Sequence, residues 1–133
     1  MIIRQISIFL ENRKGRINEV TRVLADNGIN MEAFCIAETS DFGLMRLIVS
    51  EVDRTVSVLR EAGFAVIVTD VVSISCRNVA GALASVLEIL AGRGIFIEYM
   101  YAFSQKETAD VIIKPDSLAD CEKVIEELGL DNR

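Results

Sequence analysis

Two short segments carry the same pair of residue types, an asparagine followed three positions later by a glycine: Asn12 with Gly15, and Asn78 with Gly81. Each pair precedes a stretch with helical spacing of apolar residues. Free N–H groups and the positive end of a helix dipole favour an anion there, and an Asn amide offers both a donor and an acceptor. The pattern predicts recognition of a small zwitterion. A helix cap or a turn shaped by the asparagines explains it equally well.

The two segments differ in charge. The first is basic and the second apolar, because Arg13, Lys14 and Arg16 are replaced by Val79, Ala80 and Ala82. We hypothesise that the basic loop attracts the carboxylate of an amino acid, while the second loop supplies an apolar wall or a protein contact. A solvated basic surface is an equally good interpretation.

The segments match because the sequence contains an internal repeat. Residues 6–64 fall without a gap on residues 72–130, and about a dozen of the aligned pairs are identical, Gly28 with Gly94 and Glu32 with Glu98 among them. The period predicts two small modules, 1–70 and 71–133, with no linker between them.

Each module shows the same order of elements. Alternation at 6–10 and 72–76 predicts a strand, and helical spacing at 17–24 and 83–90 predicts a helix that ends at a glycine. A hairpin follows at 29–37 with 44–49, and at 95–103 with 109–113. Further helices are expected at 52–59 and 118–128, and a last strand only in the first module, at 64–69. The fold class is therefore α+β, as two tandem ferredoxin-like βαββαβ repeats with antiparallel sheets and helices on one face.

The second module lacks most of its fourth strand, which leaves one edge of the strand at 72–76 without a neighbour. Because a bare strand edge promotes aggregation, we expect a partner chain or a natural tail to cover it.

Composition excludes several functions. The net charge is −6 with scattered basic residues, and no apolar run is long enough to cross a membrane, so neither nucleic acid nor a membrane is an expected partner. With no histidine, no paired cysteines and no carboxylate cluster, the chain offers no catalytic residues, metal site or cofactor site. Cys35, Cys76 and Cys121 are interpreted as small apolar residues. Without a secretory signal, a cytoplasmic location is expected.

Two further features have a functional and a structural interpretation. Glu32 and Glu98 lie on apolar strands and could receive a ligand ammonium or form an ion pair, or simply face outward. An aromatic strand at 99–103 could line an aromatic pocket, or could belong to the core or an interface.

These motifs also carry a family resemblance. The first module, through ISIFLENRKGRINEVTRVLADNGINM, resembles the opening half of an ACT domain, and the second, through VSISCRNVAGALASVLEILAGRGIFI, resembles another. The phrase LEN followed two residues later by glycine is also similar to the small regulatory subunit of acetolactate synthase. The resemblance covers nearly the whole chain. The type of protein that the chain resembles best is a free-standing tandem ACT protein.

The resemblance implies a non-catalytic regulatory protein that binds a small amino acid at interfaces between ACT domains and signals through subunit contacts as a homodimer. In family members attached to phosphoglycerate dehydrogenase or aspartate kinase, the Asn and Gly of the first loop and a polar residue at the start of the second strand hold the ligand. The alternative is a regulatory subunit that docks on a separate amino-acid biosynthetic enzyme with little ligand binding of its own. The expected binding residues, from the loops and from the resemblance, are Asn12, Arg13, Lys14, Gly15, Asn30, Asn78 and Gly81.

In two places the chain departs from the family pattern. Phe96 stands where Asn30 has its counterpart, and Lys14 and Ala80 stand where proline often precedes the glycine. The resemblance therefore supports the first site more strongly than the second.

Overall fold

The structure is a computed structural model that describes residues 1–11, 13–38 and 42–130. The chain forms two compact units. We call Arg4–Thr69 the first unit, and Met1–Ile3 together with Asp70–Arg133 the second unit. The assignment of ACT repeats to 1–70 and 71–133 stays a prediction.

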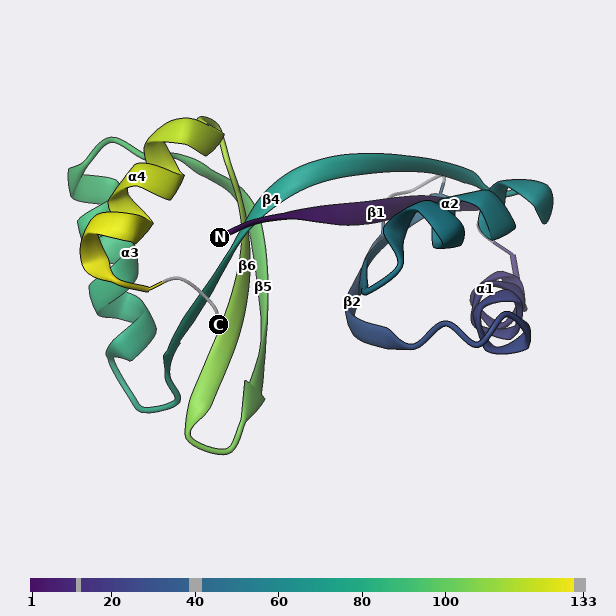
Figure 1. The fold of residues 1–133 in the computed structure, drawn as a ribbon, viewed down its shortest axis with the longest axis horizontal. Coiled ribbons are helices and arrows are strands. Elements are labelled where there is room, and N and C mark those ends of the chain that lie inside the picture. The colour runs from purple at the N-terminus through teal and green to yellow at the C-terminus, as the bar shows by residue number, and fades with distance from the viewer. Residues whose placement is uncertain (12, 39–41, 131–133) are drawn as a thin grey trace. The chain divides into compact units, whose positions relative to one another are not determined.

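Ten elements follow one another along the chain, as coloured in Figure 1. Their order is the predicted one, except that the strands expected at 64–69 and 72–76 form a single strand, β4 (Ala65–Arg77). The α+β class with two βαββαβ-like arrangements is confirmed. The elements are β1 (Ile2–Glu11), α1 (Arg16–Asp26), β2 (Met31–Glu38), β3 (Phe42–Val49), α2 (Val52–Glu61), β4 (Ala65–Arg77), α3 (Ala82–Gly92), β5 (Ile97–Gln105), β6 (Thr108–Pro115) and α4 (Leu118–Leu128).

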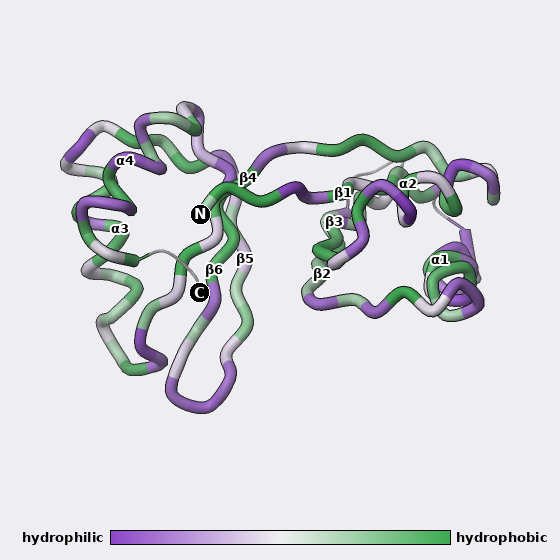
Figure 2. The backbone as a smooth tube through the Cα atoms, viewed as in Figure 1, coloured by the Kyte–Doolittle hydropathy of each residue, from purple (hydrophilic) through white to green (hydrophobic). Residues whose placement is uncertain are grey.

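In the first unit the strands are arranged in the order β2-β3-β1-β4. β1 and β3 are antiparallel, with Ile6 opposite Leu47, and β2 pairs with the other edge of β3. The apolar side of α1 (Val20, Leu24) and that of α2 (Val56, Leu59) are buried in one cluster with the inward residues of the strands. Figure 2 shows the hydrophobic and hydrophilic residues that alternate around these two helices. One face of the sheet therefore holds the core, as the period-two alternation predicts.

The second unit repeats this arrangement in the order β1-β4-β6-β5, in which Met1–Ile3 contributes the β1 residues. α3 and α4 cover one face of the sheet (Figure 1), and Val86, Leu90, Cys121 and Ile125 are buried with the strands in a second cluster. Cys121 is thus a core residue, whereas Cys35 and Cys76 are half-buried. All three thiols are free.

The expectation of an uncovered edge beside residues 72–76 is wrong. The Ser73 backbone N–H donates to the Met1 carbonyl at 2.8 Å, and the Met1 amino group donates to the Ser73 carbonyl at 3.0 Å. The Ser75 N–H donates to the Leu130 carbonyl at 3.1 Å. The edge is covered by the chain itself, because β1 begins four residues earlier than the alternation at 6–10 indicates.

The two glutamates that are identical between the repeats lie at equivalent irregularities. The pairing register shifts between Met31 and Ala33 in β2, and between Ile97 and Tyr99 in β5, so that Glu32 and Glu98 occupy matching bulges. A bulge re-aims the side chain that it carries. Glu98 accepts a hydrogen bond from Lys114 Nζ at 2.9 Å. The first repeat has Ile48 at the position of Lys114, so this ion pair belongs to the second repeat.

Candidate functional site

Both strand-to-helix loops end on a glycine in the left-handed region. Gly15 has φ +84° and Gly81 has φ +89°, and each is the N-cap residue directly before its helix, α1 or α3. A Cβ at either position would meet nothing within 4 Å, so the backbone angle and not lack of space requires glycine. Neither helix has a side-chain cap, whereas the Ser117 hydroxyl at the start of α4 accepts from the Asp120 N–H.

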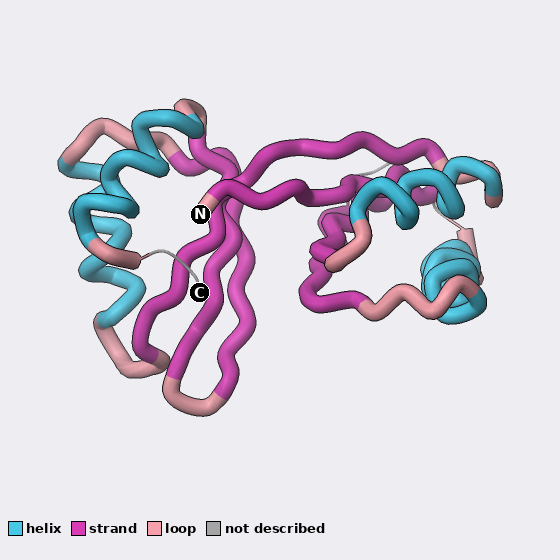
Figure 3. The backbone as a smooth tube through the Cα atoms, viewed as in Figure 1, coloured by secondary structure: helices cyan, strands magenta, loops and turns pink. Residues whose placement is uncertain are grey.

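Asn12 lies outside the described residues, and its predicted role stays a prediction. Asn78 does not cap α3. Its Nδ2 donates to the Lys106 carbonyl at 3.0 Å, and its backbone N–H donates to the Glu107 carbonyl at 2.8 Å. Asn78 therefore ties the loop between β4 and α3, drawn in pink in Figure 3, to the turn between β5 and β6.

The basic residues of the first loop are largely paired. Arg13 contacts the carboxylates of Glu11 and Glu19, each at 3.4 Å, and Arg16 contacts the same two residues at 3.6 and 2.5 Å. Within the described residues the Lys14 ammonium has no ion pair, and the side chain is exposed. Two of the three cations predicted to attract a carboxylate are therefore already balanced by carboxylates of the protein.

Arg16 is held more firmly than its neighbours. Its side chain is only 12% exposed, its guanidinium carbon lies 4.2 Å from the centre of the Phe64 ring, and its Nε is buried without a partner among the described residues. The Arg16 hydrogen bond is the main reason that the pKa of Glu19 is lowered from its ordinary value of 4.5. Arg16 therefore joins the start of α1 to the residue that precedes β4.

Asn30 lies at the far end of the same helix. It follows α1 and is exposed, whereas Gly15 precedes α1. A helix of 11 residues spans roughly 16 Å at about 1.5 Å per residue. One repeat therefore does not bring Asn30 together with the loop at 13–15. The counterpart Phe96 is 66% exposed at the equivalent end of the second repeat.

The loop of the second repeat adjoins two hollows. One of about 260 Å³ includes Asn78, Val79 and Leu83 in its lining, with residues of β5 and β6 opposite them. The other, of about 680 Å³, includes Val79, Ala80 and Gly81 with the first turns of α3. The structure thus brings Asn78 and Gly81, both predicted binding residues, to the walls of neighbouring cavities.

Arg77 lines both hollows, and the motif analysis missed it. It is the last residue of β4 and is exposed. Its position corresponds to Glu11, whose carboxylate pairs with Arg13 and Arg16 in the first repeat. An aligned comparison of the repeats beyond the Asn–Gly motif would have revealed this reversal of charge.

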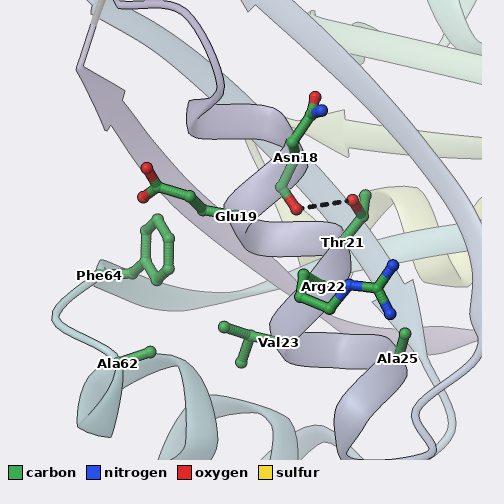
Figure 4. Close-up of a pocket in the computed structure, with 8 residues that line it drawn as sticks. All are labelled: Asn18, Glu19, Thr21, Arg22, Val23, Ala25, Ala62 and Phe64. Atoms are coloured by element: carbon green, nitrogen blue, oxygen red, sulfur yellow. Dashed lines mark hydrogen bonds between the residues drawn. The ribbon is translucent and has the colours of Figure 1, made fainter.

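A further open hollow of about 750 Å³ lies beside α1 (Figure 4). Polar residues of α1 border it, and Val23, Ala62 and Phe64 provide an apolar part. Figure 4 shows the Thr21 hydroxyl donating to the Asn18 carbonyl, at 3.0 Å. None of Arg13, Lys14, Gly15 and Asn30 is among its lining residues. These four predicted binding residues of the first repeat therefore lie outside this hollow.

The described part of the chain holds no group of three or more His, Cys, Asp or Glu residues that could bind a metal. Among residues 1–11, 13–38 and 42–130, no helix has the length and apolar character that a membrane crossing requires.

The chain matches known proteins over nearly its whole length. The family model described as an ACT domain pair matches residues 1–132. The chain belongs to the ACT domain pair family. A crystal structure of protein BT0572 from Bacteroides thetaiotaomicron is similar at 51% identity and a TM-score of 0.95, covering 98% of this chain and 91% of that one. No curated protein matches the chain by sequence.

More distant ACT-domain structures share the fold. The ligand-free regulatory subunit of aspartate kinase from Thermus thermophilus has a TM-score of 0.69 at 15% identity, covering 96% of this chain and 94% of that one. The corresponding subunit from Thermus flavus has a TM-score of 0.66 at 16% identity, with the same coverage. The tandem ACT resemblance is thereby confirmed for the fold and the family.

The charge network at the first loop predicts a dependence of stability on pH. Because the folded pKa of Glu19 lies below 4.5, its ion pairs stabilise the fold above that pH, and the contribution is lost as pH falls through the folded pKa. We expect Glu19→Gln to lower the melting temperature at about pH 7, and the difference from wild type to shrink towards about pH 3.

Thermal melts followed by circular dichroism across this range provide the measurement. Glu61→Gln is the matched control, since Glu61 is exposed on α2 of the same unit and has no ion pair among the described residues. A Glu19→Gln deficit that is constant over the whole range would contradict the role of the carboxylate charge.

Proposed function

We propose that this ACT protein binds a free amino acid without transforming it, at the loops that join a strand to a helix, and signals through contacts between subunits. One observation carries the proposal. Asn78 and Gly81, which correspond to Asn12 and Gly15, line hollows at the start of a helix that has no side-chain cap. Uncapped N–H groups and the helix dipole favour a carboxylate there.

The apolar character around these hollows agrees with binding rather than catalysis. Small-molecule sites are mainly apolar with a few polar groups that fix orientation. Val79, Ala80 and Leu83 line these hollows, while Asn78 provides the amide. The described residues contain no histidine and no acidic cluster beside these hollows that would supply an acid, a base or a metal site.

In the first repeat, Asn30 lies far from the loop 13–15. We propose that a second copy of the chain supplies Asn30 to this site. β2 stands at the end of the strand order and pairs with β3. It carries Phe34 and Ile36, which are 53% and 43% exposed. Antiparallel pairing of two β2 strands would place Asn30 of one copy at the same sheet end as the loop 13–15 of the other, which a single repeat cannot do. A ligand held there would favour the associated form by its differential affinity.

The amino-acid proposal is tested by a thermal-shift screen of the chain with each of the twenty amino acids. A ligand at a hundred times its Kd stabilises the folded state by about 2.7 kcal/mol, so the melting temperature should rise by about 5 °C or more. Asn78→Ala should reduce the rise, because it frees the loop from the turn at Lys106. Asn18→Ala, on the exposed surface of α1, is the matched control.

No shift with any amino acid would contradict binding. The function would then be that of a regulatory subunit that docks on a separate biosynthetic enzyme.

The homodimer is tested separately by sedimentation equilibrium. Phe34→Glu places a charge on the exposed β2 edge and should weaken self-association at least about tenfold, through lost apolar burial and like-charge repulsion across the two-fold axis. Ile89→Glu, at a 40% exposed position on α3, should leave association unchanged. A wild-type chain that sediments as a monomer at micromolar concentration would rule out this arrangement.

A further inference from the structure

The two repeats differ in charge around their equivalent loops, because a base replaces the acid and apolar residues replace the bases. In the first repeat Glu11 at the end of β1 balances Arg13 and Arg16. In the second, Arg77 occupies the position of Glu11, and apolar residues replace the arginines. The Arg77 guanidinium has no hydrogen-bond or ion-pair partner within the described residues. In this part of the chain Arg77 therefore has no ion pair that corresponds to the pairs made by Glu11.

Arg77 stands beside a cavity of suitable size for an amino acid. The cavity bordered by β4, α3, β5 and β6 measures about 260 Å³. This volume lies just below the roughly 300–1,000 Å³ of pockets for drug-sized ligands, as expected for a smaller molecule such as an amino acid. Its apolar wall consists of Val79, Leu83, Ala102, Phe103, Ala109 and Val111. Such a wall favours an aliphatic or aromatic side chain and disfavours a charged one, which would be desolvated without a partner.

Few polar groups accompany this wall. Besides Arg77, the lining includes Asn78 and Ser104. Asn78 uses its Nδ2 to hold the Lys106 carbonyl, which orients the amide and leaves Oδ1 as an acceptor. Oδ1 and the Ser104 hydroxyl are acceptors for an ammonium, while Arg77 is the donor for a carboxylate.

We propose that this cavity of the second repeat binds an α-amino acid with an apolar side chain, and that Arg77 binds its carboxylate. The inference rests on the proposed function and makes it more specific. It reverses the expected division of roles, in which the basic loop of the first repeat holds the carboxylate. The paired Arg13 and Arg16 are less available than Arg77, because a ligand would have to compete with Glu11 and Glu19.

The test is calorimetric titration of the whole chain with L-leucine and L-phenylalanine, and with L-glutamate and L-lysine for comparison. We expect binding of at least one apolar amino acid and none of the charged pair. Arg77→Ala should weaken that binding at least about tenfold. Lys123→Ala removes one positive charge from an exposed position on α4 of the same unit and should leave the affinity within about twofold.

A double-mutant cycle with the ligand separates direct contact from a general effect of charge. Wild type should bind the amino acid at least about tenfold more tightly than its carboxamide, and Arg77→Ala should lose most of this preference. Val79→Asp, at a 52% exposed position in the cavity wall, should weaken binding by repelling the carboxylate and wetting the wall.

Other outcomes would reject either the role of Arg77, the apolar class of ligand, or amino-acid binding as a whole. Binding with the same affinity and the same carboxylate preference in Arg77→Ala would reject this inference and leave the proposed function standing. Loss of binding in Lys14→Ala instead would place the carboxylate at the first loop. Preference for a charged amino acid would reject the apolar class. No binding of any of the twenty amino acids would reject the proposed function together with this inference.

Discussion

A left-handed backbone angle at one residue determines what both loops of this protein can do. Gly15 and Gly81, at φ +84° and +89°, are the last residues of the loops that lead from a strand into a helix. An L residue with a side chain would be strained there by roughly 1–2 kcal/mol, and the glycine that avoids this strain has no side chain with which to cap the helix. The free N–H groups at the start of α1 and of α3 must therefore pair with other groups, either of the protein or of a ligand.

The repeats resolve this common constraint with different chemistry. In the first, Glu19 in the opening turn of α1 and Glu11 at the end of β1 supply negative charge beside the helix start, and Arg13 and Arg16 neutralise it. In the second, the same positions hold Ser85 and Arg77, with no carboxylate among them. The Ser85 hydroxyl donates to the Gly81 carbonyl at 3.0 Å and so takes no part in charge balance. The two loops therefore share a backbone conformation and differ in charge.

Periodicity was enough to predict the order of elements, because buried apolar positions recur at intervals of two and of about 3.6 residues. It failed at the start of β1, where Met1 lies on the edge that residues 72–76 expose to it. The site was less predictable, since partners such as Glu19 for Arg16 and Lys106 for Asn78 are set by packing and by turns distant in sequence. Aligning the repeats shows that Arg77 replaces Glu11, but only the structure shows the cavity beside Arg77.

The central claim is that the loop after β4 holds an amino acid. Amide chemical shifts of the ¹⁵N-labelled chain, followed by NMR while an apolar amino acid is added, test it most directly. The account predicts saturable shift changes concentrated at residues 77–84 and at the facing residues 102–109, with smaller changes at 13–19. Changes confined to the first loop, or to the hollow beside α1, or no changes at millimolar ligand, would contradict it.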